Sequence, residues 1–308
     1  MEKTGTTILI VDDDCEIRQM ISDFLRDCES YNVLEAENGK QALEILKNNK
    51  ADLVISDINM PEMKGFDLLK EIKERFPLIK RVLITAYNVE DYLNLALKHD
   101  IGNILVKSVP FNFSEFTSII SYLLNGDIFG LSHYFDESVS EKKMKIRSSR
   151  ALDKDAELII DQLGPIDQPK CLELVIVELL TNAIFYGIRN EMPDKKELWS
   201  HDFLLPEEQA IKVSVARDDH KYAISVSDFG GRLKKYDILY WLNRQISCNQ
   251  DGLPLGLYDS HGRGFFIVRK YIDRLIINID QARKTEIIII NYFSKVYKGY
   301  KPLYINEI

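Results

Sequence analysis

The sequence has few cysteines and no long apolar run. Its 308 residues hold four cysteines, which form no CxxC pair and have no neighbouring histidine, so the pattern indicates neither a zinc site nor a disulfide framework. We interpret Cys15, Cys28, Cys171 and Cys248 as free thiols. The N-terminus lacks the apolar core of a secretory signal, and no apolar run reaches the ~20 residues that span a bilayer. We therefore expect a cytoplasmic protein with no membrane partner.

Positive charge is scarce relative to negative charge. The formal net charge is -8, and lysine and arginine gather in no stripe, which argues against direct DNA binding. Hydrophobic residues make up 45% of the chain and charged residues 29%, a composition typical of globular proteins. Because one domain usually holds ~100 to 200 residues, the length predicts two domains.

The first part of the chain alternates short β-branched runs with amphipathic helical stretches. We predict strands at 7–11, 32–37, 52–56, 81–85 and 103–106. This alternation is typical of an α/β doubly wound fold with a five-stranded parallel sheet. The pattern ends near residue 125, so we predict a domain at 1–125 and a linker at 126–142.

Polar side chains follow the ends of these strands. Asp12 and Asp13 follow the first strand, Asp57 the third, Thr85 the fourth and Lys107 the fifth. The carboxyl ends of parallel strands meet at one edge of the sheet, where ligands bind. Clustered carboxylates suit Mg²⁺, and a hydroxyl and an ammonium can neutralise phosphoryl oxygens. For the acidic run alone, a solvated turn before a helix is an equally good interpretation.

These strand-end motifs, ILIVDDD, LVISDINMPEMKGFDLL, VLITA and ILVKS, resemble those of the receiver domain of bacterial response regulators, over roughly residues 6 to 124. The resemblance implies a flavodoxin-like fold and an upstream histidine kinase or other phosphodonor. It implies that Asp57 is the phosphoacceptor and binds Mg²⁺ together with Asp12 and Asp13. It also implies that Thr85 senses the phosphoryl group and that Lys107 contacts it.

Two positions depart from the receiver pattern. The family's switch aromatic is here Ile104, and Ser108 stands where a proline usually follows the lysine. Tyr87, just beyond the sensing threonine, is a candidate replacement for the switch aromatic, although an aromatic beside an apolar strand is more often ordinary packing. We expect atypical output switching.

The second part of the chain predicts an α+β domain at 143–296, followed by a C-terminal tail at 297–308. We expect strands at 144–147, 211–216, 222–227, 275–279 and 285–292, and helices at 156–163 and 169–186. The connection 190–209 is long enough for an insertion or binding loop.

Two polar positions lie on the helix at 169–186. Glu178 and Asn182 are four residues apart, so they share one face of that helix. Alone, such a pair is more often solvent-facing. Asp228 and Gly230 follow a strand, where a carboxylate can accept a hydrogen bond from an exocyclic amine and glycine lets a base approach the backbone.

A glycine pair precedes the last helix. Gly262, Arg263 and Gly264 open that helix, and glycines at a helix N-terminus let backbone amides approach a polyphosphate. The stretch 240–261 is typical of a mobile lid, and a plain surface loop is the alternative.

The order ELLTNA, DFGG and HGRGFFIVR resembles the N, G1 and G2 boxes of the GHKL ATP-binding fold, an α+β two-layer sandwich, over roughly residues 143 to 294. The resemblance implies ATP and Mg²⁺ as cofactors and Glu178 as candidate general base. Arg232 departs from it, because it stands at the last glycine of the usual DxGxG. The implied binding residues are Asn182 for Mg²⁺, Asp228 for adenine, Gly230 for the base pocket, and Gly262, Arg263 and Gly264 for the phosphates.

The stretch MKIRSSRALDKDAELIIDQL resembles the start of RsbW-type anti-sigma factor serine kinases. That subgroup implies a STAS-domain antagonist, a sigma factor or both as partners, and a homodimer is also compatible with the sequence. One alternative is a noncatalytic ATP-dependent binding module switched by the receiver. Another is a histidine-kinase-like fragment, but His133 has no acidic residue after it and no long helical hairpin around it, so we interpret it as a linker histidine.

Overall fold

The computed structural model describes residues 5–28, 31–190, 203–249, 252–253, 255–256, 259, 262–294 and 299–308. Most of the connection predicted at 190–209 therefore lies outside the described residues. The same is true of much of the predicted lid after residue 249.

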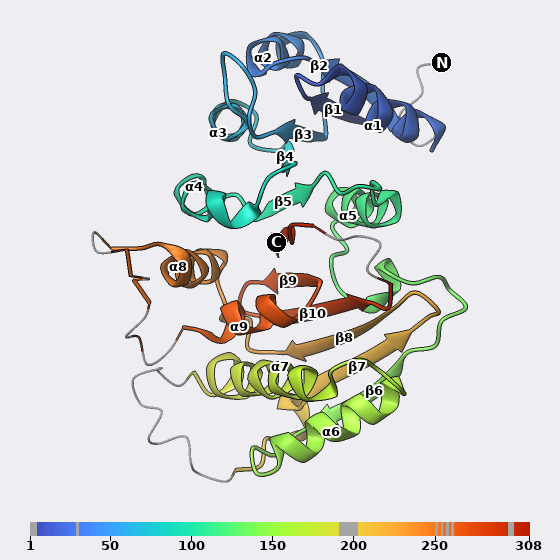
Figure 1. Cartoon of the computed structure of the whole chain (residues 1–308), viewed down its shortest axis with the longest axis vertical. Helices are drawn as coiled ribbons and strands as arrows, with labels where there is room; N and C mark the ends of the chain where they lie inside the picture. The colour runs from blue at the N-terminus through green and yellow to red at the C-terminus, as the bar shows by residue number, and fades with distance from the viewer. Residues whose placement is uncertain are drawn as a thin grey trace.

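The N-terminal part confirms the predicted parallel sheet, whose strands run in the order β2-β1-β3-β4-β5 (Figure 1). This is the order of a doubly wound, flavodoxin-like domain. Its strands are β1 (Thr6–Val11), β2 (Tyr31–Ala36), β3 (Leu53–Asp57), β4 (Lys80–Thr85) and β5 (Asn103–Val106). Its helices are α1 (Cys15–Asp27), α2 (Gly39–Asn48), α3 (Gly65–Arg75), η1 (Val89–Tyr92), α4 (Leu93–His99) and α5 (Phe113–Asn125).

The second part is an antiparallel sheet in the order β9-β10-β8-β7-β6, so the chain here is α+β as expected. Its assignment to the GHKL fold stays a prediction. The strands are β6 (Lys142–Ile146), β7 (Ile211–Arg217), β8 (Lys221–Asp228), β9 (Arg274–Asp280) and β10 (Lys284–Tyr292). The helical segments are η2 (Leu131–His133) before β6, then α6 (Leu152–Leu163), α7 (Pro169–Thr181), η3 (Asn182–Ile188), η5 (Glu207–Gln209), α8 (Lys235–Ile246) and α9 (Gly264–Tyr271).

The two sheets are joined by β11 (Leu303–Glu307), which lies in the segment expected to be a C-terminal tail. This strand pairs antiparallel with β5 and parallel with β9, so the described part of the chain forms one 11-stranded sheet. The C-terminus accordingly lies between β5 and β9 (Figure 1). The two predicted domains therefore meet through main-chain hydrogen bonds as well as side chains.

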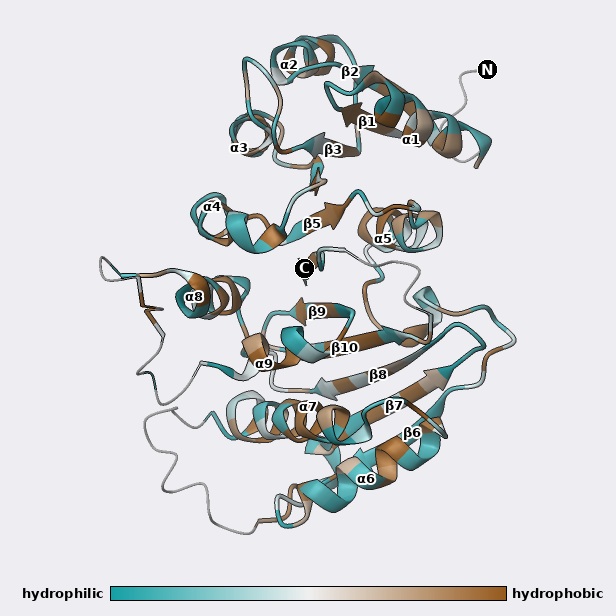
Figure 2. Ribbon diagram, viewed as in Figure 1, coloured by the Kyte–Doolittle hydropathy of each residue, from teal (hydrophilic) through white to brown (hydrophobic). Residues whose placement is uncertain are grey.

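Alternate side chains of the strands enter two apolar cores on opposite faces of this sheet, visible as brown strand segments in Figure 2. One core lies under α2, α3, α4, α8, α9, α7 and α6. The other lies under α1, α5 and the linker, whose Ile128 and Leu131 pack on the second sheet's outer face. A two-layer sandwich would leave that outer face open, whereas here α5 and the linker cover it.

The helix Pro169–Ile188 is long and apolar enough, by length and composition, to cross a membrane. Half of its most apolar window is buried inside the protein, including Val175, Ile176 and Leu179. A core helix of a soluble protein meets the same criterion, and this helix packs against α6 and α9 within the apolar core.

Candidate functional site

The ends of β1, β3 and β5 bring two carboxylates and one ammonium together. Lys107 Nζ lies 2.6 Å from Asp57 Oδ1 and 2.7 Å from Asp12 Oδ2. Asp57 is only 7% exposed and Asp12 is fully buried, so the lysine offsets two charges that burial would otherwise disfavour. The structure thus brings together three of the side chains that the sequence singled out.

Backbone atoms of the loop after β3 lie close to Asp57. Its Oδ2 accepts a hydrogen bond from the Asn59 amide at 2.5 Å. Gly65, at the start of α3, lies so close that a Cβ atom there would overlap the Asp57 carbonyl oxygen. The Gly65 amide donates to the Ile58 carbonyl at 3.0 Å, which closes the loop between β3 and α3.

The three consecutive aspartates divide into different environments. Asp12 is buried, Asp13 is exposed, and Asp14 caps α1 by accepting from the Glu16 and Ile17 amides at 2.9 and 3.3 Å. The solvated-turn interpretation therefore describes the third aspartate and not the first. Within the described ranges no three His, Cys, Asp or Glu side chains already stand in a metal-binding arrangement.

The donor set around Asp12 nevertheless fits a hard cation. Burial raises the pKa of Asp12, and the neighbouring Lys107 only partly opposes this effect. The Lys107 pKa is itself raised, because its hydrogen bonds and attraction to both aspartates outweigh its burial. Among the described residues the Lys107 ammonium pairs with Asp12 Oδ2, and a carboxylate oxygen has a further lone pair with which it can bind a cation.

Thr85, at the end of β4, is 1% exposed, and its Oγ1 accepts a hydrogen bond from the Tyr87 amide at 3.1 Å. The Tyr87 ring is 58% exposed. Ile104 is fully buried on β5, where it pairs with Leu303 of β11. The position of the family's switch aromatic is therefore part of the core where the two sheets join.

A second candidate site is a cavity of about 460 Å³ in the C-terminal part, within the ~300 to 1,000 Å³ of small-molecule pockets. Its walls come from α7, η3, β8, α8, α9 and β10. Six sequence-predicted positions from three distant segments of the chain line it: Glu178, Asn182, Asp228, Gly262, Arg263 and Gly264. Gly230 lies just outside the lining, and its amide donates to Asp228 Oδ1 at 2.9 Å.

Asp228 ends β8 at the floor of this cavity. It is 5% exposed, and burial raises its pKa to about 6. Gly187 and Gly230 flank it so closely that a Cβ atom on Gly187 would meet its carboxylate and one on Gly230 would overlap the Gly187 carbonyl. This carboxylate is thus buried without an ion pair among the described residues, in space that only glycine leaves open.

At two further positions of the cavity, neighbouring side chains leave no room for a Cβ atom, so glycine is required. A Cβ atom on Gly264 would overlap Glu178 Oε1, so the carboxylate of α7 rests directly on the first residue of α9. Gly262, with a φ of +81°, lies against the indole of Trp241 on α8. Asn182 begins η3, a π-helical segment, and such interruptions of an α-helix are frequent at functional sites.

Sequence reasoning missed several lining residues, above all Thr285 on β10. Its side chain is buried, its Oγ1 has no hydrogen-bond partner in the described structure, and it pairs across the sheet with Asp228. Only that cross-strand register, which the sequence alone does not provide, identifies it. The other missed residues are Ala183, Tyr186, Gly187, Asn190, Arg232, Leu233, Asp237, Ile238, Trp241, Phe265, Ile267 and Ile287.

The expected lid at 240–261 needs one correction. Its first part belongs to α8, which continues to Ile246, because the apolar residues Ile238, Leu239 and Leu242 repeat at helical spacing and are buried. Beyond the helix, Asp259 pairs with Arg244 at 2.6 and 3.0 Å, which ties this segment back to α8.

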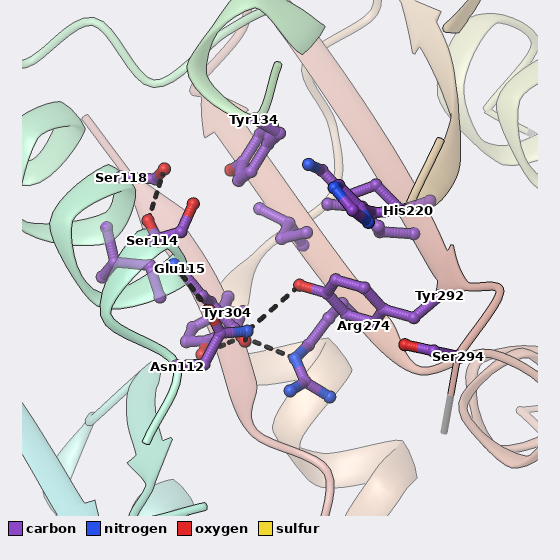
Figure 3. A pocket seen from close by; sticks show the side chains of 14 residues that line it. Asn112, Ser114, Glu115, Ser118, Tyr134, His220, Arg274, Tyr292, Ser294 and Tyr304 are labelled. Atoms are coloured by element: carbon purple, nitrogen blue, oxygen red, sulfur yellow. Dashed lines mark hydrogen bonds and ion pairs between the residues drawn. The ribbon is translucent and has the colours of Figure 1, made fainter. Parts of the chain in front are cut away.

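A third pocket, of about 300 Å³, lies between α5 and the outer face of the second sheet (Figure 3). Several of its polar groups pair with one another: Glu115 accepts from Arg274 Nε and from the Tyr304 hydroxyl, both at 2.6 Å. Asn112 donates to Glu115 at 2.9 Å and lies 3.3 Å from the Tyr292 hydroxyl. This network joins the two parts of the chain.

A doubly wound sheet with a buried aspartate, a lysine and a threonine at neighbouring strand ends defines a phosphoacceptor domain of the signalling class. Residues 8–121 match the response regulator receiver domain. The chain is 38% identical over 118 residues to the chemotaxis protein CheY of Bacillus subtilis, covering 38% of this chain and 97% of that protein. The chain therefore belongs to the response regulator receiver family through its N-terminal part.

Two other similar proteins are much longer than the matched region. A histidine kinase P4 of Formosa agariphila is 40% identical over 125 residues, which is 40% of this chain and 9% of that protein. The chain likewise spans 25% of the transcriptional regulatory protein ZraR of Klebsiella oxytoca. A structure of Vibrio cholerae CheY4 is 30% identical, covers 39% of this chain and 99% of its own, and has a TM-score of 0.36. Receiver domains bind Mg²⁺ at the phosphorylation site and act downstream of a phosphodonor such as a histidine kinase.

Proposed function

We propose that this response regulator accepts a phosphoryl group on Asp57 and thereby controls an ATP-dependent serine kinase formed by its C-terminal part. In the first reaction an oxygen of Asp57 attacks the phosphorus atom, and the donor's leaving group departs with the former bonding pair. Lys107, and Thr85 once its hydroxyl turns, stabilise charge on the transferred oxygens. Asp12, Asp13 and Asp57 would hold Mg²⁺. The bound cation would neutralise negative charge on the phosphoryl oxygens.

The same proposal assigns the 460 Å³ cavity to ATP. Asp228 accepts a hydrogen bond from the exocyclic amine of adenine, and Thr285 adds its unpaired hydroxyl beside it. Asn182 holds Mg²⁺ on the phosphate side. The amides at Gly262 and Gly264, at the start of α9, face the phosphates together with Arg263.

Glu178 is the general base of this kinase. It takes the proton from a serine of the substrate protein while the serine oxygen attacks the γ-phosphorus and ADP leaves. The substrate class is a small STAS-domain antagonist, and a sigma factor is the second partner. One observation carries the proposal: residues from three distant segments of the chain line the same cavity. These are Glu178 and Asn182, Asp228, and the glycine pair at 262 and 264.

Transfer of label from γ-³²P ATP tests the kinase. We expect acid-stable label on the serine of a STAS-domain partner, none with Glu178→Gln, and full transfer with Glu173→Gln, which changes the same helix at an ion pair with Lys170. Both variants should bind ATP like the wild type. Retained transfer by Glu178→Gln would contradict the assigned base.

One observation favours a second candidate, an ATP-dependent binding module without catalysis. Arg232 replaces a glycine of the pattern and lines the cavity, where it adds a fixed positive charge near Asp228. That module would bind ATP and exchange partners without labelling any of them. The histidine-kinase alternative would require acid-labile label, and His133 instead lies in the linker, edge-on to the ring of Tyr122 on α5.

A further inference from the structure

Two of the helices that wall the nucleotide cavity, α8 and α9, also contact the receiver. From α8, Asp237, Ile238 and Trp241 line the cavity, and from α9, Gly264, Phe265 and Ile267 do so. Helix α8 packs against receiver helix α4 (Figure 1). Helix α9 reaches the receiver at η1, the short helix that follows β4 and its terminal Thr85.

Arg269 makes this second contact. Its side chain is 4% exposed, and its two terminal nitrogens donate to the carbonyl oxygens of Pro302 and Lys301, both at 2.5 Å. Its Nε lies 3.7 Å from Glu90 Oε1 and makes no hydrogen bond within the described structure. A buried guanidinium with one unsatisfied donor, facing a carboxylate just beyond hydrogen-bond distance, gains energy if that carboxylate approaches.

Glu90 is connected to the phosphorylation site by a short stretch of backbone. The Tyr87 amide donates to Thr85 Oγ1 at 3.1 Å, and Val89, the first residue of η1, is fully buried. If the Thr85 hydroxyl turns toward a phosphoryl group on Asp57, the Tyr87 amide loses its acceptor. The segment from Tyr87 to η1, which carries Glu90, is then free to change its position relative to α9.

Two other ion pairs between the two parts are shorter. Arg274 and Glu115 pair at 2.6 Å beneath α5 (Figure 3), and Lys235 and Asp100 pair at 2.8 Å between α8 and α4. Asp100 is additionally held by Lys73 at 2.8 Å. The pair of Glu90 with Arg269 at 3.7 Å is therefore the loosest of these three contacts and the one nearest in sequence to the sensing threonine.

We propose that Glu90 and Arg269 transmit the phosphorylation state of Asp57 to the nucleotide cavity by setting the position of α9. Arg269 is a positioning residue, because it touches no substrate and lies five residues beyond Gly264 on the same short helix. The inference rests on the proposed nucleotide site. Coupling of this kind typically changes affinity by about 5- to 150-fold.

The test uses the full chain with ADP, Mg²⁺ and beryllofluoride, a mimic of the phosphoryl group on aspartate, and reads ADP affinity by calorimetry. We expect beryllofluoride to change the ADP Kd of the wild type by about fivefold or more. Glu90→Gln should bring that ratio to one, while Asp91→Asn, the exposed neighbour, should keep it. Thermal unfolding of the three proteins should be alike, because Glu90 is 38% exposed and a single loose pair contributes little.

Linkage gives a reciprocal check, since ADP must change beryllofluoride affinity by the same factor in the wild type and not in Glu90→Gln. A wild-type ratio of one, or an unchanged ratio in Glu90→Gln, would overturn the coupling alone. Absence of ADP binding by the wild type in both states would overturn the nucleotide site and the coupling with it.

Discussion

Gly102, just before β5, lies against Ile305 of β11 so closely that a Cβ atom at Gly102 would overlap the Ile305 carbonyl oxygen. The Ile305 amide donates to the Gly102 carbonyl at 2.9 Å. The join between the two sheets thus requires a residue without a side chain at this point. At this contact β5, the last strand of the receiver sheet, pairs with β11.

We expect Gly102→Ala to loosen this join. Forcing a methyl group into a filled site costs about 1 to 3 kcal/mol, so thermal unfolding should begin at lower temperature. Amides of β11 should also exchange faster with deuterium. Gly126→Asn is the matched control, because Gly126 has a φ of +72° that asparagine tolerates and no atom lies within 4 Å of its added Cβ. Unchanged exchange of β11 in Gly102→Ala would contradict this role.

Asp57→Asn should abolish phosphorylation by a small-molecule donor such as acetyl phosphate. The amide is a far weaker nucleophile than the carboxylate that Lys107 now contacts at 2.6 Å. Intact-protein mass spectrometry should show one added phosphoryl group on the wild type and none on this variant. Asp67→Asn, exposed on α3, should be labelled like the wild type. Label on Asp57→Asn would point to another acceptor.

The strand-end residues could be predicted because their convergence follows from geometry alone. In a parallel sheet the carboxyl ends of β1, β3 and β5 meet, so sequence position gives spatial position for Asp12, Asp57 and Lys107. The different environments of Asp12, Asp13 and Asp14 could not be predicted. Whether an aspartate is buried or caps a helix depends on where α1 begins, which the sequence leaves uncertain by a residue or two.

The features that join the two parts could not be predicted, because they depend on pairings between distant segments. Nothing local marks 303–307 as a strand between β5 and β9 rather than a tail. The same holds for Thr285, whose place in the cavity follows from its register with Asp228. Arg269 and Glu90 have ordinary helical surroundings in the sequence, and only the assembled sheet brings them together.

Asp228→Asn should stabilise the protein without ligand at neutral pH. Burial raises the Asp228 pKa from 3.8 to about 6. Between pH 3.8 and pH 6 the carboxyl group is therefore mostly protonated in the folded state and mostly ionised in the unfolded state. Stability therefore falls as pH rises from about 4 to 6, and the full cost, about 3 kcal/mol, is present above pH 6. Asparagine carries no charge and can still accept from the Gly230 amide.

Denaturant unfolding at two pH values checks this. The advantage of Asp228→Asn over the wild type should be largest at pH 7.5 and fall to roughly half at pH 5. An advantage that grows as pH falls would contradict the sign. Asp280→Asn, at the less buried end of β9, should differ little from the wild type at either pH.

Thr285→Val should weaken nucleotide binding without harming the fold. The Thr285 hydroxyl is buried and unpaired in the described structure, so valine of similar shape should leave stability unchanged or slightly higher. Loss of one hydrogen bond to bound nucleotide should raise Kd by roughly tenfold. Thr285→Ser keeps the hydroxyl and should retain most of the affinity. Equal affinity in the valine variant would place the nucleotide elsewhere.

The most direct test of the account is equilibrium binding of ATP and GTP to the full chain in the presence of Mg²⁺. Asp228 is a buried acceptor, so it should favour the amine of adenine and reject the carbonyl that guanine presents at the same position. We expect saturable binding of one ATP, little binding of GTP, and loss of ATP binding in Asp228→Asn. No saturable ATP binding, or ATP affinity unchanged by Asp228→Asn, would contradict a nucleotide site in the C-terminal part.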